Sequence, residues 1–333
     1  MSELNLLDKK LLYELDLDSR QTFQQLARKL RIGQEVVRYR LNRMLDTKII
    51  EEFMAVIDTG KLGFYHYETY FRFYKLTEPR EKELINYLKR LNNLLWISSC
   101  NGHYDLVFSV VAKDNIHYSE IISKITNKYG EYIAERNIQA TIKIPHFTRS
   151  YLLPNKKPRE IYFSSSKDKL KIDKKDFKIL KTIMNHGRMP IIEIASKTKL
   201  SEDVVKYRLK QLRKKQIIQT FRPRINKDKI NRLLYQILFT FKNLNEGLKN
   251  QFIEFCKGFG NVVYVLDTIG KFDLIIELEP KDQDEFNETL RKIRNEFADK
   301  ITNYEIINIT KEHQMDYFKV DEKEYFNIKT LIN

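Results

Sequence analysis

The sequence contains few cysteines, glycines and prolines, and it has no long apolar run. Among 333 residues, two are cysteine, ten are glycine and seven are proline. Cys100 and Cys256 stand far apart without a second cysteine at metal-ligand spacing, which argues against a disulfide framework and a cysteine-based zinc site. No apolar stretch approaches the roughly 18 residues of a membrane span, and the first residues lack the apolar core of a secretion signal. We therefore expect a soluble, cytoplasmic protein with no membrane partner.

The motifs of common enzymes are also missing. The sequence has no His-Glu-x-x-His zinc motif, no glycine-rich loop that could hold a phosphate and no nucleophile elbow. We therefore expect no enzyme, no metal and no cofactor.

Positive charge, in contrast, is abundant. Lysine and arginine number 60 against 45 acidic residues, which gives a net charge of +15. Such an excess favours a polyanionic partner, with nucleic acid first and an anionic membrane second. Part of the excess also fits a solvated surface in a chain rich in lysine.

The chain contains one long unit twice. When it is shifted by 168 residues, Val36–Leu41 falls on Val204–Leu209, and Gly102–Asp105 falls on Gly270–Asp273. This period is far longer than the roughly 20–50 residues of solenoid repeats, so a whole module has been duplicated. A duplicated chain can build within one molecule the two-fold arrangement that other proteins reach by dimerising.

Each copy begins with a short helical segment, at residues 1–52 and 171–220. Apolar residues recur there with the helical period, and a tight turn separates the second helix from the third. This pattern predicts a helix-turn-helix. Ser201 is expected to cap the third helix of the second copy, whereas Gly33 replaces it in the first copy and caps more weakly.

A longer segment follows in each copy, at residues 53–150 and 221–320. The order strand, helix, strand, strand, helix, strand predicts a ferredoxin-like βαββαβ domain. Alternation at Tyr67, Thr69 and Phe71 indicates a strand with one buried face. Residues 151–170 are expected to be a linker, with a short edge strand at 161–163. The predicted class is α+β, with two winged or helix-turn-helix domains alternating with two ferredoxin-like domains.

These motifs together resemble the Lrp/AsnC family of transcriptional regulators. The family pattern is carried by Asp8, Leu11-Leu12, Arg20, Ala27 and Val37–Leu41, and it returns as Asp176, Ile179-Leu180, Arg188, Ala195 and Val205–Leu209. The Gly-x-Tyr/Phe-Asp hairpin of the family occurs twice as well. The resemblance implies a DNA-binding regulator, although the common form is a single unit that dimerises. It also implies an amino acid or other small effector near the hairpins, with these candidate neighbours: Gly102, Tyr104, Asp105, Gly270, Phe272 and Asp273.

The third helix of each copy is the expected DNA-reading element, because this helix of the motif enters the major groove. Its first turns carry the candidate base-reading residues Gln34, Glu35, Arg38 and Tyr39 in one copy, and Glu202, Asp203, Lys206 and Tyr207 in the other. Because the two sets differ, we expect two unlike half-sites. The acids equally fit a structural role at a helix N-terminus.

Basic residues further along the same helices are candidate phosphate contacts: Arg40, Arg43, Arg208, Lys210, Arg213, Lys214 and Lys215. Arg40 and Arg208 also suit a partly structural role. Arg20 and Arg188 precede the second helices, where each could hold a phosphate or pair with an acid such as Asp18.

Three further expectations remain open at this stage. The two α/β domains are expected to pair sheet face to sheet face within the chain, and the pseudo-dimer could assemble further. An enzyme similar to siroheme decarboxylases is one alternative function, although His66, His103 and His117 have no histidine at the equivalent positions of the second copy. A small-molecule-binding protein with degenerate DNA-binding heads is the other.

Overall fold

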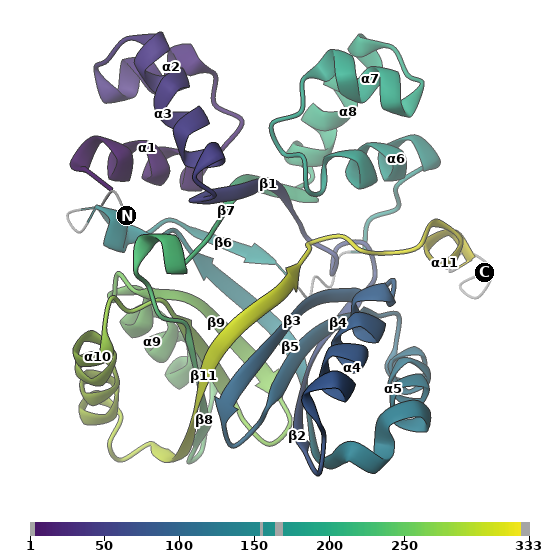
Figure 1. The fold of residues 1–333 in the computed structure, drawn as a ribbon, viewed down its shortest axis with the longest axis vertical. Coiled ribbons are helices and arrows are strands. Elements are labelled where there is room, and N and C mark those ends of the chain that lie inside the picture. The colour runs from purple at the N-terminus through teal and green to yellow at the C-terminus, as the bar shows by residue number, and fades with distance from the viewer. Residues whose placement is uncertain (1–3, 154–155, 164–168, 328–333) are drawn as a thin grey trace.

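The computed structural model describes residues 4–153, 156–163 and 169–327, and it shows two levels (Figure 1). Two three-helix heads stand side by side above one β-barrel, which carries helices on its outside. Pro154, Asn155 and residues 164–168 of the predicted linker lie outside the described residues. Within the described ranges, no helix is both long and apolar enough to cross a membrane.

The first head consists of α1 (Leu6–Leu17), α2 (Phe23–Leu30) and α3 (Gln34–Asp46), and the second of α6 (Lys174–Ile183), α7 (Ile191–Thr198) and α8 (Glu202–Lys214). The predicted capping difference is confirmed. The Ser201 hydroxyl accepts from the backbone N–H of Val204, whereas Gly33 supplies no side-chain cap.

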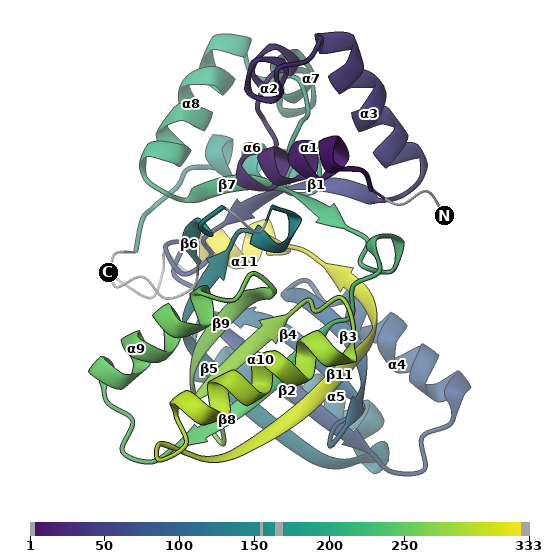
Figure 2. The ribbon, with the colours of Figure 1, turned by 90° about the vertical axis from the view of Figure 1, so that its left-hand side faces the viewer.

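Each head continues into a wing strand, and the two wings pair with each other. Strand β1 (Ile50–Ile57) runs antiparallel to β7 (Ile218–Ile225), with Ala55 opposite Phe221. This two-stranded sheet lies between the heads and the barrel (Figure 2). The copies are therefore joined directly beneath the DNA-binding motifs.

The barrel is built from four long strands of each copy. The first copy supplies β2 (Tyr65–Phe73), β3 (Leu94–Gly102), β4 (Leu106–Ala112) and β5 (Ile133–Phe147), and the second supplies β8 (Tyr235–Phe241), β9 (Val262–Ile269), β10 (Leu274–Leu278) and β11 (Ile301–Met315). Their order is β2-β4-β3-β11-β8-β10-β9-β5, and pairing of β2 with β5 closes the ring. The α+β class and the two βαββαβ units are confirmed.

We expected two separate sheets that pair face to face. The structure instead joins them into one closed barrel. Strands β5 and β11, 15 residues each, extend beyond their own unit and pair with β9 and β3 of the other copy. The sheets therefore join through their edges, which satisfies backbone groups that an open edge would expose. Strand β2 consequently has two buried faces. Phe71 packs under the outer helices, and Tyr70 belongs to the core cluster that reaches the barrel interior.

The outer helices cover the barrel in pairs, α4 (Glu78–Arg90) with α5 (Asn115–Tyr129) and α9 (Glu246–Lys257) with α10 (Gln283–Glu296). Strand β6 (Glu160–Phe163) adds to β5, as the sequence predicted for residues 161–163. Short 3-10 turns lie at η1 (Gly130–Tyr132), η2 (Ser150–Leu152) and η3 (Asp228–Ile230), and α11 (Glu322–Asn327) is the last helix. Tyr325 of α11 packs on Phe177 of α6, which ties the chain's last helix to the second head.

Candidate DNA-binding surface and barrel pocket

The two expected reading helices lie on opposite flanks of the head pair, as Figure 2 shows for α3 and α8. Each helix leads at its C-terminal end into a wing strand beneath it, so its N-terminal turns lie toward the end of the molecule that faces away from the barrel. Val37 and Leu41 of α3, like Val205 and Leu209 of α8, are buried in their heads. The opposite face of each helix is left open to solvent.

The residues expected to read bases occupy this open face. Gln34, Glu35, Arg38 and Tyr39 are exposed, and so are Glu202, Asp203, Lys206 and Tyr207. Tyr39 is 68% exposed and Tyr207 is 64% exposed, so both rings are accessible to a partner. Their contact with DNA stays a prediction.

The two copies arrange their basic side chains differently at this surface. The Arg38 guanidinium lies 5.1 Å from the ring centroid of Phe23, and its Nε is 3.6 Å from Glu35. Lys206 Nζ lies 3.5 Å from Glu202 and 3.6 Å from Asp203. Such exposed pairs contribute little to stability, so both cations can be released to a stronger anion.

Three of the expected phosphate contacts, Arg40, Arg43 and Arg208, form ion pairs within their own heads, and their contact with DNA stays a prediction. Arg40 and Arg43 donate to the buried carboxylate of Asp8 at 2.7 Å and 2.6 Å. Arg208 donates to Asp173 and Asp176 at 2.7 Å and 2.9 Å. We interpret these arginines as fixing the third helix on the first. Lys210 and Lys214 are exposed and make no ion pair within the described part of the chain.

Arg20 and Arg188 each bond to backbone carbonyls of the opposite head, a contact that the sequence did not predict, and a phosphate contact by either arginine stays a prediction. Arg20 donates to the backbone carbonyls of Gly187 and Met189, 2.9 Å and 3.1 Å away in the second head. Arg188 donates in return to the carbonyls of Ser19 and Gln21 in the first head. The two arginines are turned inward because their carbonyl partners come from the opposite copy, which periodicity does not reveal.

A buried ion network connects the first head to the barrel. Asp16 of α1 accepts from Arg222 of β7 and from Arg149, whose Nη1 lies 2.8 Å from it. Arg149 also donates to Glu279 at 2.9 Å. Burial alone would raise the pKa of both carboxyl groups. Arg222 and Arg149 nevertheless hold the pKa of Asp16 below its ordinary value, and Arg149 and Lys227 hold that of Glu279 at about 2.

The hairpin residues expected near an effector have structural partners. Asp105 accepts from the backbone N–H of Phe73 and Asp273 from that of Phe241, both at 2.7 Å. Gly102 has a φ of 131°, and a Cβ there would meet the Ile306 carbonyl oxygen at 2.6 Å.

The other hairpin positions are closely packed as well. A Cβ at Gly270 would meet the Gln139 side chain at 2.3 Å, while Tyr104 and Phe272 are fully buried. An effector beside the hairpins stays a prediction.

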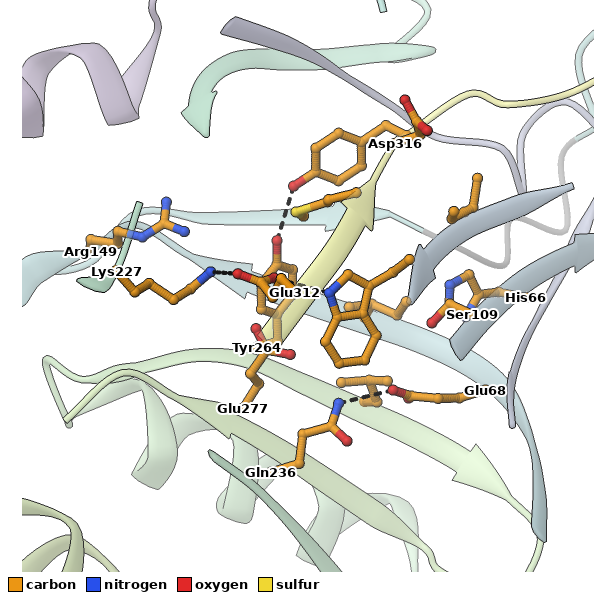
Figure 3. Close-up of a pocket in the computed structure, with 16 residues that line it drawn as sticks. His66, Glu68, Ser109, Arg149, Lys227, Gln236, Tyr264, Glu277, Glu312 and Asp316 are labelled. Carbon is orange, nitrogen blue, oxygen red and sulfur yellow. Dashed lines mark hydrogen bonds and ion pairs between the residues drawn. The ribbon is translucent and has the colours of Figure 1, made fainter. Parts of the chain in front are cut away.

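A pocket within the barrel was not found from the sequence (Figure 3). Its volume is about 70 Å³. Glu68 of β2 accepts from Gln236 of β8 at 2.9 Å, and Glu312 of β11 accepts from the indole of Trp96 at 3.0 Å and from Lys227. Acids within otherwise apolar strands were the signal that could have indicated it.

The histidines do not converge on a common centre. His66 lies at the pocket with Nδ1 3.2 Å from the Thr141 hydroxyl, and burial lowers its pKa to about 4. His103 pairs with Glu135, and His117 lies 3.4 Å from Glu324. Among the residues that the structure describes, no group of three His, Cys, Asp or Glu side chains could hold a metal ion.

Comparison with known proteins matches each head to a DNA-binding family and part of the chain to HTH-type transcriptional regulators. The winged helix-turn-helix DNA-binding family model matches residues 4–51 and 172–219. An HTH-type transcriptional regulator of Pyrococcus furiosus is 30% identical over 142 residues, which are 42% of this chain and 94% of the relative. The HTH-type transcriptional regulator Ptr1 of Methanocaldococcus jannaschii is 31% identical over 111 residues, or 33% of this chain and 74% of the relative.

Solved structures of one other protein align with both copies at once. The siroheme decarboxylase NirDL aligns over 98% of this chain and 98% of its own, with a TM-score of 0.63 and 14% sequence identity. At this identity the likeness concerns the fold. It shows that two heads on a joined barrel are an arrangement found in another single chain.

Proposed function

Because the chain belongs to the Lrp/AsnC family of helix-turn-helix regulators, in tandem-duplicated form, we propose that it is a sequence-specific DNA-binding transcriptional regulator. In this proposal, one chain binds one duplex through α3 and α8 and acts as an intramolecular pseudo-dimer. The observation that carries the proposal is the pair of exposed reading helices on heads that are bonded to each other. A dimeric regulator brings its two reading helices together only by association, whereas here both helices belong to one covalent chain.

The geometry supports a two-part site on DNA. A recognition helix presents its first turns to the major groove, where each base pair has a distinct donor and acceptor pattern. Arg38 suits a guanine because its fork can donate twice, while Lys206 offers a single point charge. The two half-sites should therefore differ in sequence, and their centres should lie roughly 34–36 Å apart or a multiple of that distance.

A gel-shift experiment tests this function. The full chain is titrated against the duplex upstream of its own gene at moderate salt, with unrelated competitor DNA in excess. Retardation that survives the competitor supports a regulator. If only salt-sensitive retardation is seen, and competitor removes it, the heads are degenerate and the proposal fails, since any basic protein binds DNA in that way.

An enzyme on the same architecture is the second candidate, and the full-length fold match to NirDL is what favours it. The barrel pocket argues against it. At about 70 Å³ it is much smaller than the roughly 300–1,000 Å³ of sites for drug-sized ligands, and a tetrapyrrole is larger still. We propose that the chain is not an enzyme, because the pocket inside the barrel cannot hold a tetrapyrrole, although larger grooves lie elsewhere on the surface. A Soret band that shifts when siroheme is titrated into the protein would favour the enzyme instead.

A further inference from the structure

Two carboxyl groups of the barrel pocket, the buried Glu68 and the partly exposed Glu277, form no ion pair with any residue that the structure describes. Glu68 is 1% exposed, and while one of its oxygens accepts from Gln236, its Oε2 has no hydrogen-bond partner. Glu277 of β10 lines the same pocket and makes neither a hydrogen bond nor an ion pair with any residue that the structure describes. Carboxyl groups are rarely buried without a partner. Moving even a neutral polar group out of water without a hydrogen bond costs roughly 2–7 kcal/mol, and moving a charged carboxylate costs more. Each of these carboxyl groups therefore needs either a bound proton or a cation beside it.

The positions of these two acids follow the pseudo-symmetry of the chain. Glu68 lies opposite Ser109 on the neighbouring strand, and Gln236 lies opposite Glu277. These two cross-strand pairs are equivalent, because Gln236 and Glu277 stand 168 residues after Glu68 and Ser109. Each copy therefore contributes one carboxyl group. In the first copy it is Glu68, which precedes its partner Ser109 in the chain, and in the second it is Glu277, which follows its partner Gln236. Since Gln236 touches Glu68 and neighbours Glu277, both acids border the same space.

The cations nearest to the pocket are already engaged elsewhere. Arg149 is paired with Asp16 and Glu279, and Lys227 is paired with Glu312. The equivalent aromatic residues Trp96 and Tyr264 complete the walls. Aromatic rings attract cations through their faces, and carboxylates attract them more strongly. Once ionised, the two carboxylates would repel an anionic ligand, and a neutral ligand would not offset their charge.

We propose that this pocket binds a small organic cation with a primary ammonium group, held between the carboxylates of Glu68 and Glu277 (Figure 3). The volume of about 70 Å³ limits the ligand to a few heavy atoms, since one water needs roughly 10–15 Å³ of such space. The inference goes beyond DNA binding and does not depend on it, because the site lies in the barrel and not in the heads.

In the empty protein, protons take the place of the cation. Burial raises the pKa of Glu68 to about 7, and burial together with Glu312 raises that of Glu277 to about 8. A bound ammonium group would displace these protons, so binding should strengthen as pH rises from 6 to 8.5 and should release protons. The other titratable or charged groups that face the two acids are His66, Tyr70, Arg149, Lys227, Tyr264, Glu279, Glu312, Asp316 and Tyr317.

Isothermal titration calorimetry of the full chain at pH 8 tests the site. The probes are methylammonium chloride and 1,4-diaminobutane, with 1-butanol and sodium chloride as uncharged and ionic controls. We expect saturable binding of at least one amine and none of the controls. Absence of amine binding up to millimolar concentrations, or equal binding of 1-butanol, would overturn the proposal.

Variants distinguish this site from surface attraction. Glu68→Gln and Glu277→Gln should each weaken amine binding roughly ten- to a hundredfold, because each removes one charged acceptor. Both variants should fold, since Gln has the size of Glu and already occupies position 236, the equivalent of position 68 in the second copy. Glu254→Gln removes an exposed acid of α9 and should bind as the natural protein does. Undiminished amine binding by the folded Glu68→Gln/Glu277→Gln double variant would contradict the proposal, whether or not the protein binds DNA.

Discussion

Arg20 and Arg188 occupy equivalent positions in the two copies, and each donates hydrogen bonds to backbone carbonyls of the opposite head. An ion pair also joins the heads, where Arg213 of α8 donates to the carboxylate of Asp18 at the end of α1, at 2.8 Å. Together with the β1–β7 pairing, these contacts fix the separation of the two reading helices. The duplicated chain therefore has a built-in spacing for its DNA site.

Loosening the heads should relax this spacing. The double variant Arg20→Met/Arg188→Met keeps the apolar stems and removes the donors, each worth roughly 1.5–3 kcal/mol as a hydrogen bond from a charged group. We expect the natural protein to prefer one separation in a series of duplexes whose half-sites are moved apart base pair by base pair. The variant should accept several separations. An unchanged preference would show that the arginines do not set the spacing.

Base reading should depend on Arg38 and Lys206. Replacing either with alanine should weaken binding to the specific duplex by about 1–3 kcal/mol, which is the usual worth of one base contact. Binding to unrelated DNA should change much less, and circular dichroism should show an intact fold because both side chains are exposed. Lys300→Ala, an exposed cation next to the start of β11, is the matched control. Equal specific binding by all three variants would discard the assignment of these residues.

Breaking the buried ion network should destabilise the whole chain. Asp16→Asn leaves the buried Arg149 and Arg222 without their shared carboxylate, and such a loss typically costs about 3–5 kcal/mol. Urea unfolding measures the change as a lower midpoint. Glu14→Gln, on the same helix, removes only a partly exposed pair with Lys29 and should cost less than about 1 kcal/mol. Equal midpoints for the two variants would deny the network a structural role.

Stability should change with pH in two opposite windows. The pKa values of Asp16 and Glu279 are depressed in the folded protein, so their contribution is present above about pH 4 and is lost as pH falls toward about 2. The pKa values of Glu68 and Glu277 are raised to about 7 and about 8, so the folded state binds more protons than the unfolded state, and stability declines as pH rises from about 5 to about 8.

Thermal unfolding across this range checks the second window. The double variant Glu68→Gln/Glu277→Gln should lose much of the decline between pH 6 and 8, whereas Glu254→Gln should keep it. An identical pH profile for both variants would show that the two pocket acids do not titrate as their burial indicates.

The local structure was predictable because it follows from neighbouring residues. Ser201 caps α8 as expected from a hydroxyl before two acids, and the apolar period placed Val37 and Leu41 in the core of the first head. The duplication itself is visible by eye. These features need no knowledge of which residues meet across the chain.

The features that were missed depend on contacts between the copies. Periodicity assigned one buried face to the strand containing Phe71, but closure of the barrel also buries Tyr70 and Glu68 on its other face. Arg20 has the expected position before a helix, yet its partners Gly187 and Met189 belong to the other head. Likewise, Glu68 and Glu277 form one site only because β2 and β10 both line the interior of the barrel. Pairing between sequence-distant segments decides such roles, and no local pattern encodes it.

Selection of bound duplexes from a random pool, with the full chain as bait, tests the central claim most directly. We predict enrichment of a two-part site, in which two unlike half-sites are separated by one fixed distance of one helical turn or a multiple of it, bound by one chain per duplex. Enrichment of a single half-site, of half-sites at variable distances, or of no sequence would contradict the account.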